Sequence, residues 1–103
     1  MTFGKTESTV RLEIHGDLDK GHVARMRESL FSAAASAPDR IVLDMADVGF
    51  VDTDALRTLI AARRRCAAAG MDFSLSRPSP AVRQLLSLTR LERVFDVENE
   101  RRG

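Results

Sequence analysis

The sequence predicts a single α/β domain whose mostly parallel central sheet has four to five strands, with helices packed on it. Residues Ile41–Met45 form a short, nearly continuous apolar run, the pattern of a strand buried on both faces. The consecutive side-chain oxygens of Asp52, Thr53 and Asp54 mark a helix N-terminus, and helical spacing of apolar residues follows at once. Strand-like and helix-like segments alternate along the chain, which indicates parallel strands joined by right-handed crossovers.

One strand and one helix are predicted before that apolar run. Residues 1–8 are polar and form a loose beginning, with an N-terminal edge strand at Thr2–Lys5. Val10–Ile14 alternates apolar and polar residues, as a half-buried strand does, and a loop at Gly16–Asp19 follows it. A helix is predicted over His22–Ala35, because apolar residues recur there every three or four positions. The apolar face of this helix comprises Val23, Met26, Leu30, Phe31 and Ala34.

A turn and a second helix follow the buried strand. Asp47–Gly49 is predicted to turn the chain, after which Phe50 and Val51 return it to the core. The helix that begins near Thr53 is expected to end at Gly70, because glycine suits the C-terminal cap of a helix. Its predicted buried face comprises Leu56, Leu59, Ile60, Cys66 and Ala67.

The last third of the chain predicts two more strands around a short helix. Met71–Leu75 alternates apolar and polar residues, which favours a third strand. Ser79 is expected to cap a helix that begins at Pro80, because proline is favoured in the first helical turn. Val94–Val97 is the predicted last strand, and residues 98–103 read as a polar tail. The predicted buried face of the short helix comprises Val82, Leu85, Leu86 and Leu88.

Composition narrows the class of protein and its partners. The chain has 103 residues, enough for one modest core, so we expect one domain over residues 1–103. Its 16 Lys and Arg residues nearly balance 15 Asp and Glu residues, which gives no support to nucleic acid or an anionic membrane as partner. The one cysteine cannot form an internal disulfide, and no segment resembles a signal peptide or a membrane span. We therefore expect a cytoplasmic protein that binds no nucleic acid and does not insert into a membrane.

The sequence contains no recognisable catalytic constellation. It has no glycine-rich phosphate loop, and no Cys or His residues at metal-ligand spacing. His15 and His22 are better explained as a strand-end residue and a helix-start residue, and Cys66 as a buried small hydrophobe. Arg63–Arg65 could bind a phosphate or an acidic partner, but a solvated helix face is the better interpretation. We expect no enzyme activity, no metal and no cofactor.

The carboxylates near the second helix allow two interpretations. Asp44, Asp52 and Asp54 could serve as acid–base groups or magnesium ligands, but the sequence offers no cradle for a phosphate substrate. Alternatively, Asp52 or Thr53 caps the helix while Asp54 complements its dipole, and such a cap stabilises by about 1 kcal/mol. The residues alone establish only an acidic, exposed helix tip on an α/β domain.

Three segments together resemble the STAS domain of anti-sigma factor antagonists. They are the Gly16–Asp19 loop after a strand, residues 41–56 (IVLDMADVGFVDTDAL) and residues 77–97 (RPSPAVRQLLSLTRLERVFDV). The resemblance extends from about Val10 to Val97, and its element order agrees with the periodicity. It implies a bacterial, non-catalytic binding domain that acts in transcription regulation by partner switching. In that family the helix tip docks on an anti-sigma factor that is also a serine kinase of the histidine-kinase ATPase fold, and docking frees the sigma factor.

The resemblance also implies a phosphorylation site, and here the sequence departs from the family. The family motif D-S-S-G-L falls on residues 52–56, and its second serine, the phosphoacceptor, is replaced by Asp54. Thr53 keeps a hydroxyl but is expected to be engaged in capping, and Ala55 replaces a glycine that lets a partner approach closely. The protein is then a permanent antagonist, a permanent mimic of the phosphorylated form, or a member of a branch with another partner. We favour a phosphorylation-insensitive regulator or scaffold.

A second function is open on the same residues. STAS-like subunits also bind the cytoplasmic ATPase of lipid-transport ABC complexes, and some carry a V-D-T-x-x-L tip that residues 51–56 resemble. In that interpretation the domain is a structural and allosteric subunit, and Thr53 is the important residue. A metal-dependent phosphohydrolase at the aspartates is disfavoured. The sequence leaves the oligomeric state open, and a dimer is compatible with it. The expected partner-binding surface comprises Asp17, Asp19, Asp52, Thr53, Asp54, Ala55 and Arg57.

Overall fold

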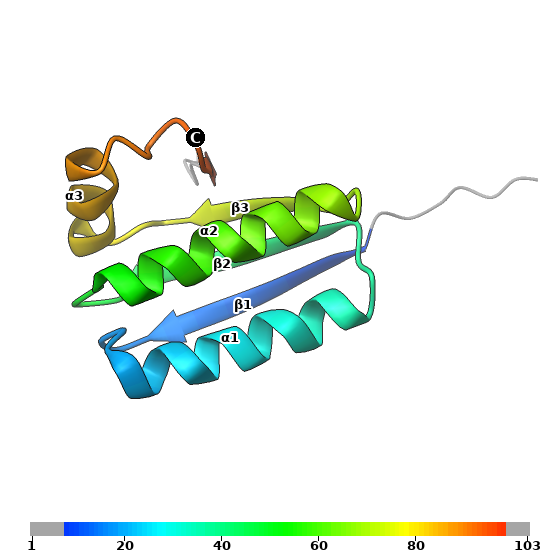
Figure 1. Cartoon of the computed structure of the whole chain (residues 1–103), viewed down its shortest axis with the longest axis horizontal. Helices are drawn as coiled ribbons and strands as arrows, with labels where there is room; N and C mark the ends of the chain where they lie inside the picture. The colour runs from blue at the N-terminus through cyan, green and yellow to red at the C-terminus, as the bar shows by residue number, and fades with distance from the viewer. Residues whose placement is uncertain (1–7, 99–103) are drawn as a thin grey trace, which may run out of the picture.

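Four parallel strands form one sheet in the computed structural model, which describes residues 8–98 (Figure 1). The strands lie side by side in chain order, from β1 to β4. Within the described residues the predicted α/β class and parallel sheet are confirmed, whereas the edge strand expected at Thr2–Lys5 falls outside them. The elements are β1 (Thr9–His15), α1 (Lys20–Ala35), β2 (Arg40–Asp47), α2 (Thr53–Ala68), β3 (Asp72–Ser76), α3 (Pro80–Leu88) and β4 (Asp96–Glu98).

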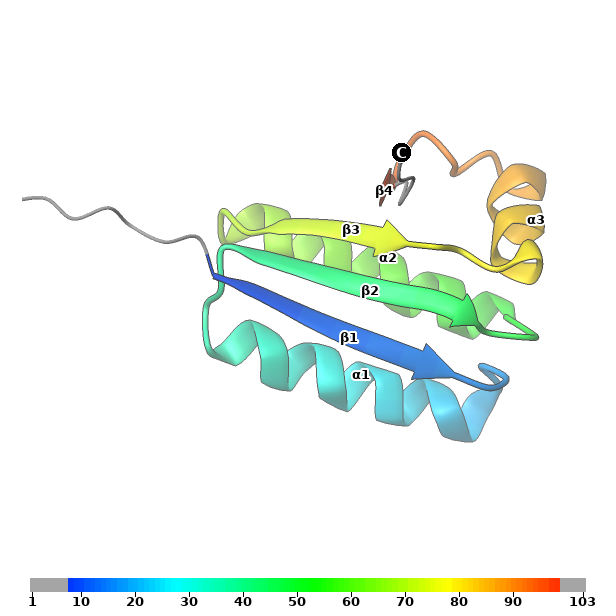
Figure 2. The same ribbon diagram turned by 180° about the vertical axis from the view of Figure 1, so that it is seen from behind.

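The helices cover the sheet unevenly. Helices α1 and α2 lie over one face, and α3 lies beyond the carboxyl end of β3 (Figure 1). Figure 2 shows the opposite face, which none of these three helices covers. None of the helices in the described part of the chain is long and apolar enough to cross a membrane. The loops at the carboxyl edge of the sheet stand at one end of the molecule, next to the N-termini of α1 and α2.

Burial along the strands follows the alternation of side chains between the two faces of the sheet. Alternate residues of β2, namely Ile41, Leu43 and Met45, are fully buried beneath the helices. Between them, Val42 and Asp44 are also buried, but they lie on the other face because side chains alternate along a strand. The prediction that this strand is buried on both faces is confirmed. In β1 the apolar residues face the helices and the intervening polar residues are exposed, as alternation predicts.

The caps define the helices much as the sequence predicts. Asp19 caps α1, so this helix begins at Lys20, two residues before the expected start. Ser79 accepts a hydrogen bond from the Val82 amide at 3.3 Å, which confirms it as the cap of α3. After α2 the chain passes through Gly70 at φ +76°, a left-handed conformation that glycine adopts without strain.

Several residues predicted to face the core are exposed instead. Phe31 is 45% exposed, because it lies one position past the buried Leu30 on the flank of α1 that faces α2. Ala67 is likewise exposed beside the buried Cys66. Phe50 is 50% exposed in the loop before α2, and Leu88 is 74% exposed at the last residue of α3. Spacing of three or four residues does not separate a buried position from its neighbour at the edge of the apolar face.

The last strand is shorter and later than predicted. Val94 and Phe95 lie in a turn, and β4 contains Asp96–Glu98. The sequence predicts that Glu98 begins the polar tail, but in the structure it accepts hydrogen bonds from Arg40 at 3.0 Å and Ser74 at 3.3 Å. These partners come from β2 and β3, so contacts across the sheet, rather than local pattern, place Glu98 in a strand. Residues 99–103 of the expected tail lie outside the described residues.

Candidate functional site

Two loops combine into one surface at the carboxyl edge of the sheet. The backbone amide of Leu18, between β1 and α1, donates to the carbonyl of Phe50, between β2 and α2, at 2.7 Å. Leu18 also forms an isolated parallel bridge with Val51, and its side chain is buried. A Cβ atom at Gly49 would lie 2.9 Å from the Asp17 carboxylate, so Asp17 lies close over the second loop. The two helix N-termini are therefore held side by side.

Asp52 is the residue that caps α2. Its carboxylate accepts a hydrogen bond from the Ala55 amide at 2.9 Å, and its backbone is extended at φ −101°. The alternative cap, Thr53, is the first residue of the helix and is exposed. Its hydroxyl makes no hydrogen bond to any residue in the range 8–98, so the expectation that capping engages it is wrong. The Thr53 hydroxyl is available to a partner.

The residues after Thr53 differ sharply in exposure. Asp54 lies in the first turn of α2 and is exposed, where its charge complements the positive end of the helix dipole. Ala55 is 0% exposed and packs in the core. Its inclusion in the partner-binding surface is therefore wrong for its side chain, because helical geometry turns position 55 inward. A small residue at this position serves packing beneath the helix.

Asp19 mirrors Asp52 at the start of α1. Its carboxylate accepts from the His22 amide at 3.4 Å and lies 2.8 Å from His22 Nδ1. The side-chain hydrogen bond with His22, followed by the one from the His22 amide, holds the pKa of Asp19 below its ordinary value. Both carboxylates thus cap parallel helices that begin at the same edge of the sheet. We call the surface formed by Asp17, Asp19, Asp52, Thr53 and Asp54 the acidic tip.

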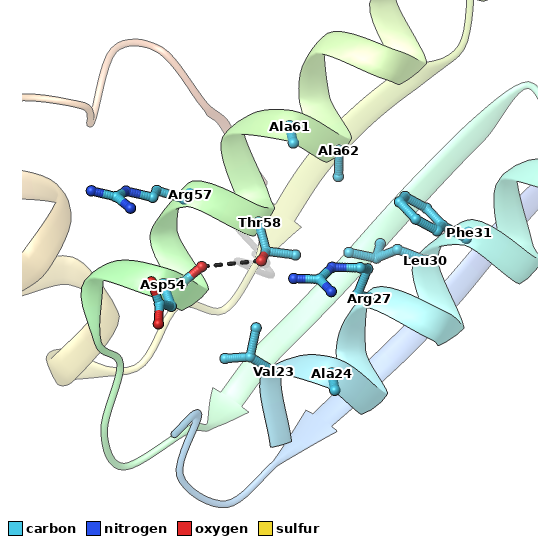
Figure 3. A pocket seen from close by; sticks show the side chains of 10 residues that line it. All are labelled: Val23, Ala24, Arg27, Leu30, Phe31, Asp54, Arg57, Thr58, Ala61 and Ala62. Carbon is cyan, nitrogen blue, oxygen red and sulfur yellow. Dashed lines mark hydrogen bonds between the residues drawn. The ribbon is translucent and has the colours of Figure 1, made fainter. Parts of the chain in front are cut away.

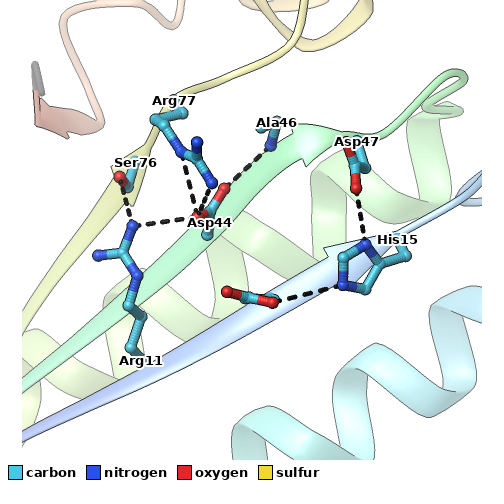
Figure 4. Close-up of polar contacts among 8 residues, drawn as sticks. Arg11, His15, Asp44, Ala46, Asp47, Ser76 and Arg77 are labelled. Carbon is cyan, nitrogen blue, oxygen red and sulfur yellow. Dashed lines mark hydrogen bonds and ion pairs between the residues drawn. The ribbon is translucent and has the colours of Figure 1, made fainter.

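Asp44 does not belong to the acidic tip. Its carboxylate is 2% exposed and accepts from Arg77 at 2.7 Å, Arg11 at 3.0 Å and the Ala46 amide at 3.1 Å (Figure 4). Burial raises the pKa of Asp44, but the hydrogen bonds from Arg77, the Ala46 amide and Arg11 outweigh it, so the pKa lies below its ordinary value. Asp44 therefore links β1 and β2 to the segment after β3.

This arrangement removes the basis of the disfavoured metal site. The supposed triad of Asp44, Asp52 and Asp54 would need all three carboxylates free to bind an ion, yet Asp44 bonds to two arginines and Asp52 to a backbone amide. Across residues 8–98, no group of three or more His, Cys, Asp and Glu side chains is arranged to hold a metal. Sequence reasoning missed Arg11 and Arg77, although a lone aspartate inside an apolar strand signals that a cationic partner is needed.

The comparison with known protein families matches residues 1–97 to the family model described as Mlab, STAS domain. The chain belongs to the STAS domain family. A STAS-domain containing protein of Pseudomonas aeruginosa is 28% identical over 86 residues, which is 84% of this STAS domain and 84% of that protein. The family assignment agrees with the resemblance carried by the loop and helix-tip residues.

Solved structures agree with this fold. The anti-sigma factor antagonist SpoIIAA in its unphosphorylated form superposes with a TM-score of 0.77 at 23% identity, covering 93% of this STAS domain and 83% of that chain. A sulfate transporter family protein from Wolinella succinogenes gives a TM-score of 0.75 at 20% identity, covering 90% and 80%. An anti-sigma factor antagonist and a sulfate transporter family protein thus share this fold.

The cap of α2 gives a direct test of how the acidic tip is held. Replacing Asp52 with alanine is expected to lower the free energy of unfolding by about 1 kcal/mol, because the Ala55 amide loses its acceptor. Thr53→Ala, which removes an exposed hydroxyl with no hydrogen-bond partner among residues 8–98, is the matched control and should change stability by less than about 0.5 kcal/mol. Urea unfolding measures both. Equal destabilisation by the two variants would contradict the assignment of the cap.

Proposed function

We propose that this STAS domain is a non-catalytic, cytoplasmic regulator that docks its acidic tip on an anti-sigma factor with a histidine-kinase-type ATPase fold. Docking competes with the sigma factor and so controls transcription. The observation that carries the proposal is the geometry of the tip. Two aspartate-capped helix N-termini lie side by side, with Thr53 and Asp54 exposed at the positions of the family's two serines.

The chemistry of the tip favours a charged docking surface over a reaction centre. Asp17, Asp19 and Asp54 place carboxylates on loops and helix starts that the sheet holds rigidly. A basic patch on the partner would complement them, and such complementarity raises the association rate and selects against wrong partners. Arg57 lies exposed one turn further along α2 and borders the same surface. Binding of this kind requires no refolding of the domain.

Asp54 makes the interaction independent of phosphorylation at this position. A phosphoserine at an exposed helix N-terminus carries about −1.5 to −2 charges, whereas aspartate carries about half of that and has no hydroxyl to modify. The α2 N-terminus tolerates the carboxylate, because the helix dipole favours negative charge there. The domain therefore keeps one charge state when related antagonists would change theirs.

Reversing one charge tests the proposed docking surface. Asp17→Lys is expected to weaken binding to the anti-sigma factor roughly tenfold or more, because an attractive contact becomes repulsive. Asp17 caps no helix, so the melting temperature should stay within a few degrees of wild type. Co-purification from the native organism identifies the anti-sigma factor, and isothermal titration calorimetry measures its affinity.

The matched control reverses an exposed acid at the other end of the sheet. Asp72 begins β3, so Asp72→Lys changes the net charge equally but lies far from the tip. We expect this variant to bind like wild type. Equal weakening by both reversals would mean that net charge, and not the tip, governs binding.

One observation favours a second function. The Thr53 hydroxyl is exposed and does not cap the helix, so it is free to contact a partner as the V-D-T-x-x-L resemblance requires. In this candidate the domain is a structural and allosteric subunit of a lipid-transport ABC ATPase. Thr53→Ala should then abolish assembly with the ATPase, while binding to an anti-sigma factor should depend more on Asp17. Co-purification of each variant with each candidate partner separates the two functions.

A further inference from the structure

A groove separates α1 from α2 beside the acidic tip (Figure 3). Its volume is about 450 Å³, and both helices contribute to its walls. Val23, Leu30 and Ala62 are buried and form an apolar floor. Small residues at Ala24 and Ala61 leave room for another chain to approach the helices closely.

The aromatic side chain of Phe31 is partly exposed to solvent in this groove. The Phe31 ring is 45% exposed, and Figure 3 shows it on the wall formed by α1, opposite Ala62 of α2. The Arg65 guanidinium lies 4.8 Å from the centre of the ring, a cation–π distance that holds the ring at the surface. Covering a large exposed aromatic side chain is favourable, so this ring is an anchor point for a partner.

The groove is positively charged where the neighbouring tip is negative. Figure 3 shows Arg27 extending from α1 toward Thr58 of α2, and Arg57 pointing away from α1 at the border of the groove. Neither these two guanidinium groups nor that of Arg65 forms an ion pair with a carboxylate anywhere in residues 8–98. Among the described residues that line the groove, Asp54 is the one acidic residue, at the end next to the tip.

We propose that the groove binds an acidic, amphipathic helix of the same partner that docks on the tip, which makes this inference rest on the proposed function. The lining residues of α1 recur every three or four positions, one helical turn apart, and so do those of α2. A third helix with apolar residues at the same spacing fits between such ridges. Acidic residues flanking its apolar stripe would pair with Arg27 and Arg65.

Charge argues against a second copy of this chain as the occupant. A two-fold dimer would place the same surface against itself, so the guanidinium groups of Arg27 and Arg65 would meet a surface on which Asp54 is the one acidic residue among the described lining to offset them. A partner of opposite charge meets no such repulsion. The partner should therefore present basic residues to the acidic tip and acidic residues to the groove, which fixes its orientation on the domain.

A designed peptide tests the groove without the native partner. The probe is a synthetic helical peptide of about 18 residues, about 27 Å long, with leucine at every third or fourth position and glutamate beside it. A second peptide carries glutamine in place of glutamate. Titration of the ¹⁵N-labelled domain at low salt should shift the amides of Val23, Ala24, Ala61 and Ala62, with the glutamate peptide binding roughly tenfold more tightly.

Variants of the domain sharpen this result. Arg27→Gln should weaken the glutamate peptide about threefold, because Arg65 still pairs with it, and leave the glutamine peptide unchanged. Phe31→Ala should weaken both peptides, because it removes the apolar anchor. Arg64→Gln is the matched control, since Arg64 is exposed on α2 but does not line the groove, and it should bind like wild type.

Four outcomes would overturn the proposal. The first two are equal affinity for the two peptides and amide shifts confined to the tip. The third is self-association through the groove when the protein concentration is raised. The fourth is displacement of the glutamate peptide from Arg27 by phosphatidylglycerol vesicles. Asp17→Lys distinguishes the two proposals, because it should leave peptide binding intact. If Asp17→Lys did not weaken binding to the anti-sigma factor, the proposed function would fail. The peptide titration would still decide what the groove binds.

Discussion

Replacing Asp44 with alanine is expected to lower the free energy of unfolding by about 3 kcal/mol, since a buried carboxylate that organises several partners is removed. Arg77, Arg11 and the Ala46 amide all donate to this one group. The amide loses its acceptor, while the two arginines, which are about half exposed, recover part of their hydration. The loss therefore falls near the lower end of what breaking a buried ion pair costs.

An exposed contact between a carboxylate and an imidazole at the same edge provides the control. Asp47 lies 2.9 Å from His15, but both side chains are about two-thirds exposed. Asp47→Ala should change stability by less than about 1 kcal/mol, because solvent screens such pairs. Urea unfolding with a common slope measures both variants. A loss at Asp47 as large as that at Asp44 would contradict the assignment of Asp44 as the organising group.

The effect of Asp44 should also depend on pH. Its pKa in the folded state lies below the ordinary value, so the charged form stabilises the fold. That stabilisation is complete above about pH 4, the ordinary range of aspartate, and is lost as the pH falls through the lower folded pKa. Asp44→Asn keeps the shape of the side chain but does not titrate. The difference in stability between wild type and Asp44→Asn should be constant from about pH 5 to 8 and shrink in stronger acid.

The local sequence pattern predicts many of the helices, strands and caps, but it predicts less well which side chains are exposed. The strand over residues 41–45, the caps at Ser79 and Asp52 and the glycine at position 70 follow from a few neighbouring residues, and the structure has them. The exposure of Phe31 and the place of Glu98 depend on other elements. Whether Phe31 is covered is decided by the distance between two helices, and Glu98 is held by side chains from β2 and β3.

The candidate site divides in the same way. The acidic tip could be predicted because Asp52, Thr53 and Asp54 are consecutive and mark a helix start by themselves. Burial of Ala55 follows from the direction in which the helix turns, which a motif comparison does not give. The links from Asp44 to Arg11 and Arg77 join residues 33 positions apart on either side, so only the register of the sheet brings them together.

Asp54→Ser is expected to turn the domain from a protein that takes no phosphate at position 54 into a substrate of an anti-sigma factor kinase. The substitution restores a hydroxyl at the exposed position where the STAS antagonists resembled by this sequence carry their phosphoacceptor serine. It leaves the Asp52 cap in place. The phosphate is bulkier than the carboxylate and would stand within the docking surface, so the affinity for the kinase should fall roughly tenfold or more despite the added negative charge.

The single substitution is a cleaner test than a variant that also restores the glycine at position 55. Ala55 is fully buried, and glycine there would remove a packed methyl group and lower helix stability by about 1 kcal/mol. Asp54→Ala is the matched control, because it loses the same charge and gains no hydroxyl. Combining Asp54→Ser with Thr53→Ala assigns any phosphate to one hydroxyl. Intact-mass spectrometry after incubation with the kinase and ATP measures the phosphate on wild type and on the three variants. Phosphate on the wild-type chain, or none on Asp54→Ser from a kinase that binds it, would contradict the role given to position 54 and favour the transport subunit.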